Sequence, residues 1–300
     1  MGTYSISQLE KFSGIKAHTI RMWEKRYGII TPHRTEGNTR YYDDDQLRHL
    51  LNVVSLLHDG GKISHLCSLS SAELDKLLAQ QINKVKSGEA SDEGLITSLL
   101  KCGMAYEEGK FVQVLNDSIN SLGMENVYFR LLLPLLERIG LMWGKDDICP
   151  AQEHFISNLI VRRLNAEIHA LDTDRRKAGG EGWVLFLPEG EHHQTGLLLA
   201  NLILRKKGIN TLYLGANVPL ESLKHAINNF RSSAVYFFLT TQKPSDELED
   251  YINSLVNLLP KIKMYISGNE RCLTGVNFPP VVRKIYSLDD LNKEIKLFKS

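Results

Sequence analysis

The chain has 300 residues, a length that predicts two or three domains. Its formal net charge of +1 excludes a chain that is basic throughout, so any nucleic-acid site has to be a local patch. The four cysteines form no C-x-x-C pair, and no apolar run approaches the ~20 residues of a membrane helix. We therefore expect a reduced, cytoplasmic protein with no membrane partner and no export signal.

Two short helices separated by Gly14 are the first predicted elements. Residues 5–8 have the spacing of a capping box, and a second helix is predicted over 16–26. On the second helix His18, Met22 and Arg26 recur at intervals of four, which leaves one face polar and largely cationic. This pattern predicts a helix-turn-helix.

A hairpin is predicted at residues 33–42, with Gly37 and Asn38 near its tip. Residues 16–40 contain six Lys or Arg and two Glu, an excess of four positive charges in an otherwise balanced chain. Phosphate binding requires such a local excess. A helix capped by acidic residues 43–45 then follows and is expected to end at residues 60–61.

The first quarter of the chain resembles the winged helix-turn-helix of MerR-type regulators. The resemblance is carried by IRMWEKRYG at 20–28, by Pro32 and Arg34, and by RYY at 40–42. It implies that double-stranded operator DNA is a partner, with the second helix in the major groove and the wing along the backbone. It implies phosphate contacts from Arg34, Arg40 and Tyr41, and base-edge contacts from the outward residues His18, Thr19, Arg21 and Arg26. The alternative is that Arg26 and Arg40 make only surface or intramolecular salt bridges.

A polar stretch at 79–94 predicts a linker, which assigns the DNA-binding domain to 1–78. Residues 95–176 have a helical pattern throughout, with expected breaks near Gly109, near Gly123 and at residues 146–147. They predict a four-helix bundle.

One end of this bundle combines an indole with an acid and an imidazole. Trp143 ends one predicted helix, and Glu153 and His154 open the next. An indole offers a flat apolar lid, and a carboxylate can accept ribose hydroxyls.

Residues 180–300 alternate strands and helices, which predicts a Rossmann-like, doubly wound parallel sheet. The loop after its first strand, at 183–187, contains Glu191, His193 and Gly196. Loops at the carboxyl ends of such strands bind ligands. A neutral imidazole is the commonest metal ligand, and a carboxylate two residues away can fix its tautomer. Taken alone, the six residues 191–196 also fit a loop in which the histidine is simply exposed to solvent.

This loop resembles the Asp/Glu-x-His-x-x-Gly loop of cobalamin-binding Rossmann-like domains. The resemblance implies His193 as the lower axial ligand of cobalt, displacing the benzimidazole of the cofactor, with Glu191 orienting the imidazole. Gly196 would let the helix start close under the flat cofactor. Thr240 and Gly268 stand nearest to two further sites that make room for the nucleotide tail in those domains, with Ser267 in place of a second glycine.

The order of the motifs resembles the CarH/LitR type of adenosylcobalamin-dependent photoreceptor repressor over nearly the whole chain. This implies adenosylcobalamin as the cofactor, held between bundle and Rossmann-like domain, with methylcobalamin as the other form to consider. It implies that Trp143 and Glu153 cover the adenosyl group, with His154 beside them, and that the chain forms a homo-oligomer, a dimer or a tetramer. Gly144 departs from the histidine that can follow the Trp in that type, so His154 becomes the candidate for a second cobalt-binding histidine.

Three functions are therefore weighed. The leading one is a cobalamin-dependent, light-responsive transcriptional repressor without enzyme activity. The second is a MerR-type regulator whose C-terminal half has lost cobalamin and docks a protein partner. The third, corrinoid methyl transfer or mutase chemistry, leaves the DNA-binding head unexplained and no further substrate domain in the chain.

Overall fold

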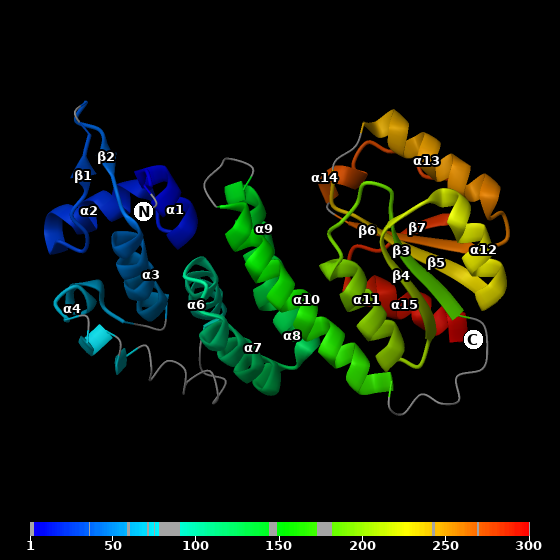
Figure 1. The fold of residues 1–300 in the computed structure, drawn as a ribbon, viewed down its shortest axis with the longest axis horizontal. Helices are drawn as coiled ribbons and strands as arrows, with labels where there is room; N and C mark the ends of the chain where they lie inside the picture. The colour runs from blue at the N-terminus through cyan, green and yellow to red at the C-terminus, as the bar shows by residue number, and fades with distance from the viewer. Residues whose placement is uncertain are drawn as a thin grey trace. The chain divides into compact units, whose positions relative to one another are not determined.

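The structure is a computed structural model that describes residues 3–35, 37–58, 61–70, 72–74, 76–77, 91–143, 149–172, 182–241, 244–268 and 270–299. The chain divides into two compact units, residues 1–159 and 160–300. The first is helical with a small hairpin, and the second is built on a parallel sheet (Figure 1). Among the described helices, none has the length and apolar character needed to cross a membrane.

The first unit opens with the predicted helix-turn-helix, α1 (Ile6–Ser13) and α2 (Ala17–Tyr27). The capping box is present, because the Ser5 hydroxyl accepts from the Gln8 N–H and the Gln8 side chain accepts from the Ser5 N–H. Gly14 ends α1 at a φ of +72°, a conformation that favours glycine. The buried side chains of the pair are Leu9, Phe12, Ile20 and Trp23.

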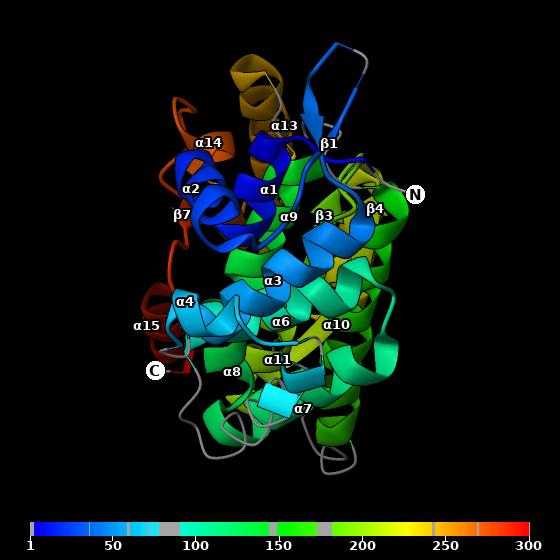
Figure 2. The ribbon, with the colours of Figure 1, turned by 90° about the vertical axis from the view of Figure 1, so that its left-hand side faces the viewer.

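The predicted hairpin follows as β1 (His33–Arg34) and β2 (Arg40–Tyr41), which pair antiparallel and project from the unit (Figure 2). The rings of His33 and Tyr41 stack across it at 5.2 Å. Tyr42 is fully buried and its hydroxyl donates to Glu24 of α2, so the hairpin base is tied to the second helix. The next helices are α3 (Asp44–His58) and α4 (Ile63–Leu66).

The remaining helices of this unit are α6 (Asp92–Met104), α7 (Glu108–Leu122), α8 (Met124–Val127), the π-helical turn η1 (Tyr128–Leu132), α9 (Leu133–Trp143) and the start of α10 (Pro150–Asp172). The break expected near Gly109 lies at residues 105–107, and Gly109 itself sits in the first turn of α7. The break at Gly123 is confirmed. The break expected at residues 146–147 falls outside the described residues.

The predicted DNA-binding domain and the first part of the predicted bundle share one compact unit. Helix α3 packs on α6 (Figure 2), where the Ser55 and Ser98 hydroxyls lie 3.0 Å apart and Lys101 donates to Asn52 over 2.7 Å. The predicted linker, 79–94, lies outside the described residues up to residue 90. Its end is not a linker, because Ser91 caps α6 and residues 92–94 are helical.

The second unit contains a five-stranded parallel sheet in the order β4-β3-β5-β6-β7. The strands are β3 (Gly182–Pro188), β4 (Asn210–Val218), β5 (Ser232–Leu239), β6 (Lys263–Gly268) and β7 (Val282–Lys284). This confirms the predicted doubly wound sheet. Strand β4 runs to Val218, with register shifts against β3 close to Gly215 and Asn217, which both adopt positive φ.

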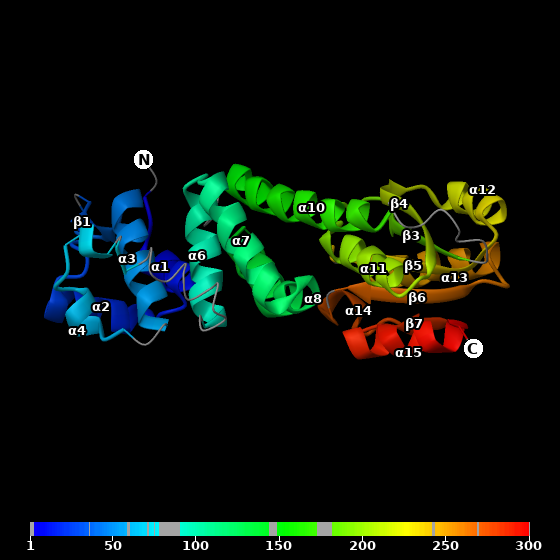
Figure 3. The same cartoon turned by 90° about the horizontal axis from the view of Figure 1, so that it is seen from below.

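Alternation along the strands assigns the helices to the two faces of the sheet. Val235 and Phe237 point into a core with α12 (Leu220–Phe230) and α13 (Ser245–Leu258). Trp183 points to the opposite face, where it stacks on Tyr265 and meets Phe298 of α15 (Leu288–Lys299). Helix α15 runs beside the last strands (Figure 3). The remaining helices are α11 (Thr195–Lys206), on the Trp183 face, and α14 (Glu270–Leu273).

Candidate functional site

The predicted cobalt-binding loop lies where the strand order of the sheet reverses, because the chain adds β4 on one side of β3 and then adds β5 on the other side. β3 is flanked by β4 on one side and by β5 on the other. Glu191 follows β3, and Thr240 and Thr241 follow β5. Ligands of open α/β sheets bind outside the carboxyl ends of the strands at such a switch point.

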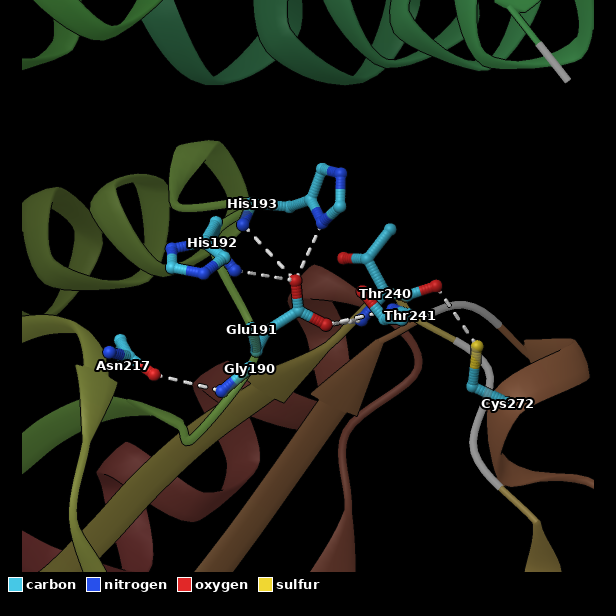
Figure 4. A network of polar contacts seen from close by, with 8 residues as sticks. All are labelled: Gly190, Glu191, His192, His193, Asn217, Thr240, Thr241 and Cys272. Carbon is cyan, nitrogen blue, oxygen red and sulfur yellow. Dashed lines mark hydrogen bonds and ion pairs between the residues drawn. The ribbon is translucent and has the colours of Figure 1, made fainter.

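Glu191 is fully buried and organises the loop (Figure 4). Its Oε1 accepts from the backbone N–H of His192 at 3.0 Å and of His193 at 3.1 Å, and pairs with His193 Nδ1 at 2.6 Å. Its Oε2 accepts from the backbone N–H of Thr240 and of Thr241, each at 2.7 Å. One carboxylate therefore joins the β3–α11 loop to the end of β5.

The charged form of Glu191 is strongly favoured in the folded protein. Burial by itself raises the pKa of this carboxyl, but the hydrogen bonds from the His193 ring and from the Thr241, Thr240 and His193 backbones outweigh it and hold the pKa at about 2. A fixed negative charge thus lies directly against the imidazole of His193.

The His193 ring is held in one orientation through its Nδ1. Its Nδ1 is engaged by Glu191, and its side chain is 52% exposed. Figure 4 shows the ring on the side of the loop that faces away from the sheet. A carboxylate that takes one ring N–H fixes the tautomer and makes the other nitrogen a better ligand. His192 meets Glu191 through its backbone N–H.

Asn217 supports the other flank of the loop, a role that the sequence analysis missed. Its side-chain oxygen accepts from the Gly190 N–H at 2.9 Å, and its own N–H donates to the Glu191 carbonyl at 3.2 Å. Asn217 adopts a φ of +56°. An asparagine among glycine and proline at a strand end is the signal that indicates such a conformation.

Gly196 packs against an aromatic ring that the sequence analysis also missed. A Cβ at this position would lie 2.5 to 2.9 Å from three carbons of the Phe238 ring. Phe238 lies on β5 within an apolar run, and such a run does not indicate which of its members faces the loop. The predicted approach of a cofactor to Gly196 is a separate expectation and stays a prediction.

We expect Gly196→Ala to lower the free energy of unfolding by about 1 to 3 kcal/mol, because the new methyl group forces the Phe238 ring out of place. The double variant Gly196→Ala/Phe238→Leu should recover part of this loss. Gly109→Ala is the matched control, since a Cβ there meets nothing within 4 Å. Urea unfolding checks the expectation, and equal stability of both single variants would contradict it.

The other predicted cofactor residues of this unit lie at the ends of β5 and β6. Thr240 contributes its backbone N–H to Glu191, and its carbonyl accepts from the Cys272 thiol at 3.1 Å. Gly268 has no room for a side chain, because a Cβ would lie 1.9 Å from the Leu239 carbonyl oxygen. Ser267 is buried at 5% exposure.

In the first unit, Glu153 and His154 open α10 as predicted. Their side chains pair at 2.7 Å between His154 Nδ1 and Glu153 Oε2, with His154 72% exposed. The predicted Trp143 contact and the Gly144 departure cannot be placed, because the Trp143 side chain and Gly144 lie outside the described residues.

The structure also places the predicted DNA contacts. Exposed residues are His18, Arg21, Arg26, Arg34 and Arg40, and Thr19 and Tyr41 are half-buried. Among the described residues, no ion pair joins Arg26 or Arg40 to a carboxylate. Arg34 donates to the Asn38 side chain at 2.5 Å and so also braces the hairpin tip.

Comparisons with known proteins agree with both halves of this description. Residues 4–69 match the MerR HTH family regulatory protein family, and residues 95–166 match the B12 binding domain family. The HTH-type transcriptional repressor CarH of Myxococcus xanthus is 30% identical over 269 residues, 89% of each chain. The HTH-type transcriptional repressor CarA of the same organism is 27% identical over 267 residues, 89% of this chain and 86% of that one.

Among solved structures, the monomethylamine corrinoid protein of Methanosarcina barkeri matches with a TM-score of 0.53, covering 69% of this chain and 100% of its own. At 12% sequence identity, this likeness shows a shared fold only.

Proposed function

Because the chain belongs to the family of CarH- and CarA-like HTH-type transcriptional repressors, which makes it a cobalamin-binding regulator of the MerR type, we propose that it is a light-responsive repressor that senses adenosylcobalamin. The observation that carries the proposal is the buried Glu191 carboxylate held 2.6 Å from His193 Nδ1. A single oriented imidazole suits a metal whose equatorial ligands all come from a macrocycle.

The loop fits a cobalt corrinoid at its lower face. Nδ1 of His193 is occupied by an ionised carboxylate, so cobalt would be held through Nε2. Glu191 keeps the ring from rotating, and Thr240 and Thr241 keep Glu191 in place. When bound, the cofactor supplies a photolabile cobalt–carbon bond. Trp143, Glu153 and His154 are our proposed contacts to the adenosyl group, on the strength of the family resemblance.

Sensing requires that the two forms of the cofactor bias the protein differently. We infer that the adenosyl form favours a homo-oligomer, a dimer or a tetramer, that places several winged helices on one operator in the cytoplasm. Loss of the adenosyl group on illumination would favour smaller species and release of DNA. Methylcobalamin lacks the adenosyl group and should support the oligomer less well. We propose no enzymatic reaction.

The test is reconstitution in darkness. Purified protein is mixed with adenosylcobalamin, passed over a sizing column, and its visible spectrum and operator binding are recorded before and after green light. Co-elution of colour, a larger species in the dark and loss of operator binding after light support the proposal. A folded sample that elutes colourless would instead favour a regulator whose second half docks a protein partner. Methyl transfer to an acceptor would favour the enzyme alternative.

We expect Arg21→Ala and Arg34→Ala to weaken DNA binding in different ways. Arg21 is exposed on α2, so its loss should cost about 1 to 3 kcal/mol on the operator and little on unrelated DNA. Arg34 lies on the wing, so its loss should weaken all sequences similarly and reduce the salt dependence by about one phosphate contact. Titrations of operator and random DNA at several salt concentrations measure both. A sequence-selective loss in Arg34→Ala would contradict its phosphate role.

A further inference from the structure

The space beside Gly196 is filled from β5. Phe238 is flanked in sequence by Phe237 and Leu239, which point into the core with α12 and α13. Phe238 therefore points to the opposite face, where its ring lies against the first turn of α11. It is half-buried, so its ring forms part of the surface at the carboxyl edge of the sheet.

Deeper in the sheet, the same face is filled by buried side chains that hydrogen-bond to one another. Tyr236, two residues before Phe238, donates its hydroxyl to Ser267 Oγ at 2.5 Å, and Ser267 donates to the Ile285 carbonyl at 2.7 Å. Tyr236 and Ser267 are 3% and 5% exposed. This face of the sheet therefore has the Phe238 ring at its carboxyl edge, against α11, and a hydrogen-bonded Tyr236–Ser267 pair deeper in the sheet.

A complete cobalamin also needs space in this region for its nucleotide. Its lower arm is a nucleotide whose benzimidazole occupies the same axial position that His193 would take. Once displaced, the base must descend next to His193. On the β4 side the loop is tied to Asn217, and on the β5 side the room next to α11 is taken by Phe238.

We propose that Phe238 makes this chain select corrinoids by their lower arm, so that a corrinoid without the nucleotide binds more tightly than complete cobalamin. The inference rests on the proposed function, since it assumes that His193 receives the cobalt. Complete cobalamin binds only when the Phe238 ring leaves its place against Gly196, and displacing a packed aromatic ring weakens binding by about tenfold.

The experiment compares two probes that share the corrin and the adenosyl group, adenosylcobalamin and adenosylcobinamide, which lacks the nucleotide. Their dissociation constants are measured in darkness by equilibrium dialysis for the full chain, for Phe238→Ala and for Phe238→Leu. Phe237→Leu is the matched control, because its side chain lies on the opposite face. The free base also competes with His193 for cobalt, so the decisive quantity is the change in the ratio of the two constants.

We expect wild type to prefer adenosylcobinamide, and Phe238→Ala to tighten adenosylcobalamin about tenfold relative to adenosylcobinamide. Phe238→Leu should give a smaller change of the same sign, and Phe237→Leu should leave the ratio unaltered. Equal binding of both probes by wild type, or a ratio that neither Phe238 variant changes, overturns the inference and leaves the proposed function standing. Failure of wild type and variants to bind either probe overturns both.

Discussion

Replacing His193 by Ala should weaken cobalamin binding by at least about 100-fold and abolish the cobalamin-dependent part of operator binding. The reason is geometric. His193 is the ring in this loop that a buried carboxylate orients, with Glu191 Oε1 2.6 Å from Nδ1. Without the imidazole, cobalt has no ligand from the loop, while the winged helix in the other unit is unaltered. Cofactor-independent DNA binding should therefore persist.

His192→Ala is the matched control for this variant. His192 is an exposed neighbour that contributes its backbone N–H to Glu191, and an alanine keeps that N–H. Dialysis with adenosylcobalamin and gel-shift titrations in darkness and after green light measure both variants. Comparable cofactor binding by His193→Ala and His192→Ala would refute the assignment of His193.

Replacing Glu191 by Ala should lower the free energy of unfolding of the second unit by about 3 to 5 kcal/mol. The carboxylate accepts four backbone N–H groups and pairs with one imidazole nitrogen, and alanine leaves all of them without this acceptor. The strongly lowered pKa of Glu191 reports the same interactions, because they favour its ionised form in the folded state.

Glu191→Gln separates shape from charge. The amide oxygen can accept from one side of the network, but the amide nitrogen cannot accept from the other, so we expect an intermediate loss. Urea unfolding followed by the fluorescence of Trp183, which is fully buried in the same sheet, gives the stabilities. Glu191→Ala within 1 kcal/mol of wild type would mean that water replaces the carboxylate and that the loop is not organised by it.

Much of the architecture could be predicted from periodicity, because buried strands such as β3 and β5 appear as apolar runs, and α1 and α6 begin at serine caps. The loop at Glu191 could be found for a related reason: residues 189–194 are all polar or glycine, and they separate two apolar elements at a strand end. The exact position of the break near Gly109 could not be predicted, because a glycine in the first turn of a helix and a glycine between two helices look alike in sequence.

Phe238 and Asn217 could not be predicted as parts of the site, and neither could the contacts that the backbone N–H groups of Thr240 and Thr241 make with Glu191. Phe238 and its neighbour Phe237 are the same residue type in one strand, and only the pairing register decides which of them faces α11. The threonines act through backbone N–H groups, which every residue except proline possesses. Contacts of this kind depend on where the tertiary fold places the backbone, so the residue types in the sequence do not reveal them.

The most direct test of cobalt ligation is electron paramagnetic resonance of the photoreduced Co(II) form bound to protein labelled with ¹⁵N-histidine. The account predicts that the axial nitrogen splitting is a doublet, because the ligand is the ¹⁵N imidazole of His193, and that His193→Ala loses it. A triplet from the unlabelled ¹⁴N base of the cofactor would show that the benzimidazole stays on cobalt, which would contradict the account.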